Sequence, residues 1–265
     1  MRCHLTFACQ GDALAGTLDK ADGATALLWV GGGNEIRSGA FAGQAQMAAR
    51  IAQAGFPVFR FDRRGIGDSE GENRGFRASG PDIAAAVAAL RSACPLVSSI
   101  VAFGNCDAAS ALMLARGAGA DALVLANPWT IEGDEGEPPP AAIRARYAAK
   151  VADPREWLRL LSGGVSLTKL AKGLLRAAGP APAPTTLAQE IANGLRAFGG
   201  QVRILLAERD RTAQAFLANW DAADPRLGRC SGASHAFVEP ESRDWLFSQL
   251  IGALQDEQAR QLDLG

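Results

Sequence analysis

The sequence has few residues of the kinds that build metal sites and disulfide frameworks. Its 265 residues include two histidines and five cysteines. No two cysteines form a Cys-x-x-Cys pair, and the odd number does not suit a disulfide framework. We therefore expect reduced thiols, no structural zinc site and no metal or other cofactor.

Long apolar runs and a charge excess are also missing. No segment is apolar enough over sufficient length to cross a bilayer, and no apolar stretch follows a basic start at the N-terminus. The formal net charge of -1 produces no positive field that would attract nucleic acid. We expect a cytoplasmic protein without a transmembrane segment or a nucleic-acid partner, and the oligomeric state stays open. With 48% hydrophobic and 21% charged residues, the chain suits one large domain with a buried core.

Strand-like and helix-like segments alternate through most of the chain. Two apolar segments around a Gly-Asp turn, residues 5–7 and 14–18, predict an opening hairpin. Further strands are expected at residues 26–30, 58–61, 100–103, 122–126, 202–207 and 226–230. Helices are expected at residues 44–54, 81–90 and 108–116 and after each of the last two strands, and the polar tail after Asp256 is expected to fray. This alternation indicates an α/β fold with a mostly parallel sheet and helices on both faces.

The alternation is interrupted between residues 129 and 184. An acidic, glycine-rich stretch is followed by three prolines, several helical pieces and a Pro/Ala linker. We predict that residues 1–128 and 185–265 form the core. Residues 129–184 are expected to form a helical cap inserted at the carboxyl edge of the sheet, where α/β folds bind ligands. The alternative is that these helices pack against the side of the sheet.

One strand runs directly into a motif of small residues, Gly104-x-Cys106-x-Ala108, and then into a helix. The motif resembles the nucleophile elbow of α/β-hydrolases, Gly-x-Ser-x-Gly, with cysteine replacing serine and alanine replacing the second glycine. Small residues are needed because the tight turn brings its neighbours close to other backbone. We interpret Cys106 as a nucleophile whose thiolate is favoured by the helix N-terminus. The alternative is a small buried cysteine at a strand end.

A base and an acid are expected later in the chain. His235 follows the last expected strand and precedes the final helix, the position that α/β-hydrolases give to their histidine. The other histidine, His4, lies in the opening hairpin. An acid that orients the imidazole is expected after the strand at residues 202–207. The acidic candidates are Glu208, Asp210 and, further on, Asp221. We favour Asp210 over Glu208, which is nearer to the strand, although Asp210 beside two arginines would also suit a surface ion pair.

An oxyanion hole requires backbone N–H groups that face the carbonyl oxygen under attack. One is expected from Asp107, directly after the nucleophile. The other is expected from the glycine-rich loop after residues 26–30, at Gly32 or Gly33. Such a loop can also hold a phosphate, but the sequence contains neither Gly-x-Gly-x-x-Gly nor Gly-x-x-x-x-Gly-Lys-[Ser/Thr].

The run from Asp62 to Ser69 resembles the Asp-x-Arg-Gly-x-Gly-x-Ser loop that follows the fourth strand in many α/β-hydrolases. We expect this loop to support the elbow from the neighbouring strand end. We assign it no catalytic role.

Four features together resemble one bacterial group, the exosortase A system-associated hydrolases of type 1. They are Phe-Ala-Cys-Gln-Gly at residues 7–11, Val-Gly-Gly at residues 30–32 with Arg-Ser-Gly at 37–39, Phe-Asp-x-Arg-Gly-x-Gly-Asp-Ser at 61–69, and Gly-x-Cys-Asp-Ala-Ala at 104–109. The resemblance covers most of the chain except the expected cap. It implies an α/β-hydrolase fold and a link to exopolysaccharide and protein-sorting gene clusters. Residues 33–35 depart from the group's loop, so the resemblance does not extend to contacts with the substrate.

The three candidate residues predict hydrolysis of an ester or thioester, carried by a small molecule or an acyl carrier. The acyl group would pass to Cys106 and then to water that His235 activates. Amides are poorer substrates because their amine leaving group needs more help. Two alternatives stay open: acyl transfer to an alcohol or sugar by the same triad, and a non-catalytic binding protein with the same fold. The complete set of Cys, Asp and His in this order argues against the second alternative.

Overall fold

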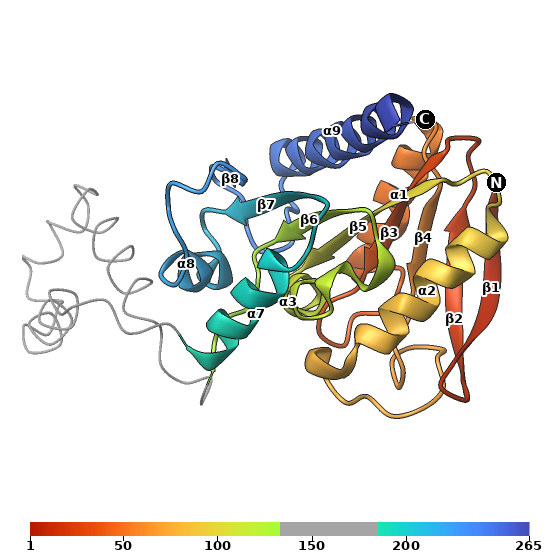
Figure 1. Ribbon diagram of the computed structural model, residues 1–265, viewed down its shortest axis with the longest axis horizontal. Coiled ribbons are helices and arrows are strands. Elements are labelled where there is room, and N and C mark those ends of the chain that lie inside the picture. Colours follow the sequence, from red (N-terminus) through yellow and green to blue (C-terminus); the bar gives the residue numbers. More distant parts are fainter. Residues whose placement is uncertain (133–184, 265) are drawn as a thin grey trace, which may run out of the picture.

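The computed structural model describes residues 1–132 and 185–264, which form an eight-stranded sheet with helices on both faces (Figure 1). The strands are β1 (Arg2–Cys9), β2 (Asp12–Asp19), β3 (Thr25–Val30), β4 (Val58–Phe61), β5 (Ser99–Asn105), β6 (Ala122–Ala126), β7 (Gln201–Ala207) and β8 (Leu227–Cys230). The α-helices are α1 (Gly43–Gln53), α2 (Gly80–Ala93), α3 (Asp107–Leu114), α7 (Thr186–Arg196), α8 (Arg211–Leu217) and α9 (Pro240–Leu264). Short 3-10 turns are η1 (Ala40–Ala42), η2 (Phe76–Ala78) and η3 (Arg116–Gly119).

The strand order across the sheet is β1-β2-β4-β3-β5-β6-β7-β8. The first two strands pair antiparallel, as do β2 and β4, and all pairs from β4 to β8 are parallel. The predicted hairpin is present, but its two-residue turn is formed by Gln10 and Gly11, with φ angles of 52° and 98°, and not by Gly11 and Asp12. Positive φ at both positions suits the right-handed twist of the two strands. The predicted mostly parallel sheet is therefore correct.

The central strands are buried because each contributes apolar residues to both layers of the core. Along β3, Leu28 and Val30 pack into the layer that contains α2, α3 and α7. Leu27 and Trp29 pack into the opposite layer, with α1 and α9. Because successive side chains of a strand point to opposite faces, a strand covered on both sides is apolar throughout. Figure 1 shows the same arrangement, with α9 across one face and α2, α3 and α7 across the other.

Helix α7 was not among the predicted elements. Thr185 caps its N-terminus, accepting a hydrogen bond from the backbone N–H of Ala188 over 3.0 Å. Leu187, Ile191 and Leu195 are buried at a spacing of four residues. This periodicity is the signal in the sequence that would have predicted the helix.

The expected fraying after Asp256 is wrong, because α9 continues to Leu264. Its buried positions Leu250, Ala253 and Leu254 are followed at helical spacing by Glu257, which is fully buried. Arg260 Nη2 donates to Glu257 Oε1 over 2.7 Å. A polar residue on the buried face is tolerated there because its charge is paired.

The predicted cap at residues 129–184 lies outside the described residues from position 133 onward. Its two ends meet at the core, beyond the carboxyl end of β6. Thr185 Oγ1 donates to the carbonyl oxygen of Thr130 over 3.1 Å, and Leu187 N–H donates to Glu132 Oε1 over 2.9 Å. The described residues on either side of this segment therefore contact each other.

Candidate active site

The three candidate catalytic residues lie at one edge of the sheet. Cys106 follows β5, Asp210 follows β7 and His235 follows β8. These strands are parallel, so their carboxyl ends meet at the same edge. The topology thus brings together residues that are up to 129 positions apart in the sequence.

Cys106 occupies a strained turn between β5 and α3. Its backbone has φ 62° and ψ -125°, a conformation that costs a non-glycine residue about 1–3 kcal/mol. Its N–H donates to the carbonyl oxygen of Ala126 in the neighbouring strand over 2.9 Å. A Cβ atom at Gly104 would lie 2.7 Å from the backbone carbon of Ala108, so only glycine fits there. The tight elbow predicted from the small residues is present.

The carboxylate that contacts the histidine is that of Asp210. Its Oδ2 lies 2.9 Å from His235 Nδ1. The same oxygen accepts the backbone N–H of Ala213 over 3.1 Å and so caps α8. Asp210 is buried, whereas Glu208 is exposed and donates its backbone N–H to Cys230. The geometry therefore favours Asp210 over Glu208 as the partner of the imidazole.

The environment of His235 favours its protonated form. Hydrogen bonding with Asp210 and, after it, with Cys106 raises the pKa of the imidazole from its ordinary 6.5 to about 10. Because Nδ1 faces the aspartate, Nε2 is the ring nitrogen left for the thiol. The His235 side chain is 42% exposed, so a substrate can reach it from solvent. A raised histidine pKa next to a cysteine suits a thiolate–imidazolium pair.

The expected oxyanion donors are only partly available. The N–H of Asp107 lies at the start of α3, directly after Cys106. Gly33 N–H, however, donates to the Oδ1 atom of Asp107 over 2.7 Å, so the expectation for Gly33 does not hold in this structure. A Cβ atom at Gly32 would lie 2.7 Å from the carbonyl oxygen of Asn105, so the glycine loop packs directly against the elbow. Asp107 and Gly32 stay as the candidate donors.

The Asp107 carboxylate has two partners. Besides accepting from Gly33, it lies 3.6 Å from the guanidinium of Arg63, which is buried. Arg63 also donates to the carbonyl oxygen of Gly33 and, over 3.0 Å, to Ser79 Oγ. The positive charge of Arg63 therefore offsets the carboxylate next to the nucleophile.

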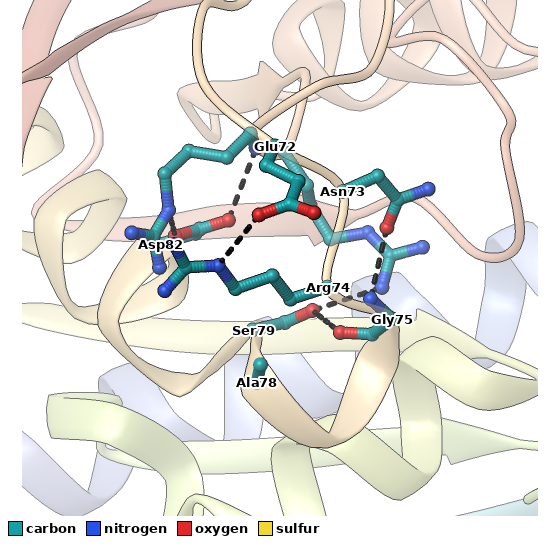
Figure 2. Close-up of a pocket in the computed structure, with 9 residues that line it drawn as sticks. Glu72, Asn73, Arg74, Gly75, Ala78, Ser79 and Asp82 are labelled. Carbon is teal, nitrogen blue, oxygen red and sulfur yellow. Dashed lines mark hydrogen bonds and ion pairs between the residues drawn. The ribbon is translucent and has the colours of Figure 1, made fainter.

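A small cavity is lined by Arg63 and by residues of η2 and the loop before it (Figure 2). Its volume is about 10 Å³, which suits at most one water molecule. Arg74 pairs with Glu72 over 3.3 Å, and Ser79 Oγ donates to the carbonyl oxygen of Gly75 over 3.2 Å. Both contacts are drawn as dashed lines in Figure 2. This cavity is too small for a substrate. Its lining includes Arg63, which contacts Gly33 and Asp107 beside the elbow.

The loop from Asp62 to Ser69 has the structural contacts expected of a support. Asp62 Oδ1 accepts the backbone N–H of Arg37 over 2.6 Å, and Asp62 Oδ2 accepts that of Asp68 over 3.1 Å. Ser69 Oγ donates to the carbonyl oxygen of Asp62 over 2.7 Å. The loop therefore ties the end of β4 to the segment that follows the glycine loop.

Two asparagines at the site were not singled out in the sequence. Asn105 precedes Cys106, and Asn127 follows β6 with a positive φ of 44°. Both donate to the backbone carbonyl oxygen of His235. Because these contacts join residues more than 100 positions apart, no local pattern predicts them.

The other cysteines have different surroundings from Cys106. Burial and a hydrogen bond to Asp82 raise the pKa of the Cys9 thiol. Burial also raises the pKa of the Cys94 thiol, although this residue is only half-buried. Cys230 is buried, and the half-buried Cys3 donates to the carbonyl oxygen of Leu18. None of these four lies at a strand-to-helix elbow.

Neither a metal cluster nor a membrane span is found in the described ranges. Within residues 1–132 and 185–264, no three His, Cys, Asp or Glu side chains are grouped to hold a metal ion. No helix in those ranges combines the length and apolar character needed to cross a membrane.

Comparison with known proteins gives a family match and structural likenesses. A model of the alpha/beta hydrolase family matches residues 26–249. No curated protein sequence matches the chain. The structure resembles the alpha/beta hydrolase GrgF from Penicillium sp. sh18, at 18% identity and a TM-score of 0.64, over 98% of this chain and 99% of that one.

Two further solved structures are similar. One is a hypothetical protein from Pseudomonas aeruginosa, at 18% identity and a TM-score of 0.60, over 97% of this chain and 93% of that one. The other is the esterase Pf2001 from Pyrococcus furiosus, at 15% identity and a TM-score of 0.59, over 97% of this chain and 90% of that one. At these identities the likeness establishes the fold, an α/β-hydrolase fold as predicted.

Proposed function

This chain belongs to the alpha/beta hydrolase family, and from that premise we propose that it hydrolyses an ester or thioester with Cys106 as nucleophile, His235 as acid–base residue and Asp210 as orienting acid. One observation carries the proposal: Asp210 Oδ2 lies 2.9 Å from His235 Nδ1, at the sheet edge where Cys106 occupies a strained elbow. A nucleophile, a base and a group that orients the base are the parts that covalent acyl transfer requires.

The first half of the reaction transfers the acyl group to sulfur. The Cys106 thiolate attacks the carbonyl carbon, a C–S bond forms, and the carbonyl electron pair moves to oxygen. Backbone N–H groups of Asp107 and Gly32 stabilise that oxyanion. The intermediate collapses, the bond to the leaving alcohol or thiol breaks, and protonated His235 gives its proton to the leaving atom.

The second half releases the acid. Neutral His235 takes a proton from water, the resulting hydroxide attacks the acyl-thiol carbon, and the C–S bond breaks. Cys106 leaves as a thiolate and His235 is protonated again, so the ion pair is restored. The negative charge of Asp210 stabilises the imidazolium in both halves.

The substrate is proposed only by class. We propose a small-molecule or acyl-carrier ester or thioester, bound under a cap formed by residues 129–184. The support for the cap is that both ends of this segment meet beyond β6, close to the catalytic edge. A placement among the type 1 hydrolases of exosortase A systems is part of the proposal and is supported by the four motifs.

The proposal is tested with p-nitrophenyl esters and acyl-CoA thioesters of graded acyl length. We expect turnover by the wild-type protein and none by Cys106→Ala, which folds because alanine fits the elbow. Cys94→Ala is the matched control, since Cys94 is half-buried and lies away from the catalytic edge. Near wild-type activity of Cys106→Ala would show that another residue is the nucleophile. Adding an alcohol and analysing the products separates hydrolysis from acyl transfer.

A further inference from the structure

The strand that carries the nucleophile and the loop that carries the histidine are joined by two side-chain amides. Asn105 Nδ2 donates to the carbonyl oxygen of His235 over 3.0 Å, and Asn127 Nδ2 donates to the same oxygen over 3.1 Å. Asn127 Nδ2 also donates to Asn105 Oδ1 over 2.9 Å. We call this closed set of contacts, made by Asn105 and Asn127 with the His235 carbonyl, the asparagine clamp.

The orientation of the Asn127 amide is determined by its partners. Its Oδ1 accepts the backbone N–H of Ala207 over 2.8 Å, at the end of β7 and three residues before Asp210. If the amide were flipped, its oxygen would face two other acceptors, Asn105 Oδ1 and the His235 carbonyl. Asn127 is fully buried and its φ is 44°, a conformation that asparagine tolerates better than most residues. The position therefore suits asparagine on both backbone and side-chain grounds.

The loop that carries His235 has no regular structure between β8 and α9. Its other anchors lie beside the histidine: Arg209 N–H donates to the Ala233 carbonyl over 3.1 Å, and Ser234 N–H donates to Glu239 Oε2 over 3.1 Å. The clamp holds the backbone of His235 itself. Through Asn105, it joins that backbone directly to the residue before Cys106.

We infer that Asn127, together with Asn105, is a positioning residue for the reaction proposed above, holding His235 so that its imidazole lies between Cys106 and Asp210. The inference rests on the proposed roles of Cys106 and His235. It adds that neither asparagine touches the substrate and that both act through the histidine backbone. Small displacements of a reacting group carry large losses in rate, so the effect of the clamp is measurable.

Two substitutions of Asn127 test the inference. Asn127→Asp keeps the size of the side chain but places a carboxylate oxygen against the two acceptors. Asn127→Gly keeps a residue suited to the positive φ and removes the amide. Asn219→Asp is the matched control, because Asn219 Nδ2 also donates to a backbone carbonyl, that of Ala215, over 3.0 Å at the end of α8. The measurements are the melting temperature, kcat and KM with a p-nitrophenyl ester, and the pH dependence of Cys106 alkylation by iodoacetamide.

We expect both folded Asn127 variants to lose kcat by about tenfold or more while KM changes by less than about threefold. Alkylation of Cys106 at neutral pH should slow and its pH dependence should change, because the imidazole no longer faces the sulfur. A merely structural role would lower the melting temperature without changing this pH profile. Asn219→Asp should match the wild type in kcat and in the alkylation profile.

Asn105→Ala provides an independent variant, since Asn105 is half-buried and its change leaves the backbone of Asn127 untouched. It removes one of the two donors to His235 and should lower kcat in the same direction, by a smaller factor. If folded Asn127→Gly and Asn105→Ala keep the wild-type kcat and alkylation profile, the clamp has no positioning role. If both Asn127 variants fail to fold, Asn105→Ala alone decides. Failure of the proposed function gives a different result, because Cys106→Ala would then keep its turnover.

Discussion

Replacing Asp210 by asparagine removes the charge that the structure places against His235 while keeping the size of the side chain. Asparagine is about as good a helix N-cap as aspartate, so α8 should keep its cap and the fold should change little. The change is therefore aimed at the electrostatics of the imidazole. Its hydrogen bond to Asp210 is the largest cause of the rise of the His235 pKa from 6.5 to about 10.

The size of the effect follows from the loss of one charge-assisted hydrogen bond of 2.9 Å. Such a bond contributes about 1.5–3 kcal/mol, which corresponds to about one to two pH units in the pKa of the group it stabilises. We expect the alkaline limb of kcat/KM, near pH 10 in the wild type, to move down by that amount. At neutral pH, kcat/KM should fall by about 10- to 150-fold for the same free energy.

The assay is the pH profile of kcat/KM for wild type, Asp210→Asn and the control Glu208→Gln. Glu208 is exposed and its carboxylate has no contact with the imidazole, so the control should follow the wild-type profile. The alkaline limb of the profile should move to lower pH, because Asp210 raises the pKa of His235 and loss of its charge favours the neutral imidazole. An unmoved limb in Asp210→Asn, or an equal movement in Glu208→Gln, would refute the reasoning.

Three further results are expected. Gly104→Ala should lose about 1–3 kcal/mol of unfolding free energy, because its Cβ would lie 2.7 Å from backbone. Chemical denaturation measures this loss, and Gly199→Ala is the control because its Cβ would meet nothing within 4 Å. Equal stability of the two variants would show that a Cβ at position 104 is not crowded. The stabilisation that protonated His235 provides is fully present below about pH 6.5 and is lost as the pH rises toward about 10. The melting temperature of His235→Gln should therefore vary less with pH in that window than that of the wild type. Equal variation in the two proteins would show that protonated His235 does not stabilise the fold. Asp107→Asn should raise the rate of Cys106 alkylation, measured by mass spectrometry, about twofold by removing a nearby negative charge. A slower rate would show that the Asp107 carboxylate does not disfavour the thiolate.

Local patterns in the sequence were sufficient for most of the sheet. Apolar runs between turn residues predicted all eight strands to within a few residues. The central strands gave the clearest signal, because a strand covered on both faces is apolar throughout. The order Cys106, Asp210, His235 also followed from the sequence, since each comes after a strand of the parallel part of the sheet. The end of α9 was predicted too early in the sequence, because the buried, paired Glu257 looks like a surface residue in the sequence.

What the sequence did not predict depends on contacts between distant residues. Gly33 was an expected oxyanion donor, but the side chain of Asp107, 74 positions away, accepts its N–H. The contacts of Asn105 and Asn127 with His235 arise only when three strand ends meet at one edge. Hydrogen bonds of this kind depend on tertiary geometry and have no period or spacing in the chain.

The central claim, an activated thiol at Cys106, is tested most directly by alkylation resolved by residue. Native protein is treated briefly with iodoacetamide at neutral pH, and the modification of each of the five cysteines is measured by mass spectrometry. The informative comparison is with Cys94, which is also half-buried but whose thiol pKa is raised by burial. We predict that Cys106 reacts fastest and that this advantage is lost in His235→Gln. Equal rates at Cys106 and Cys94 in the wild-type protein would contradict the claim.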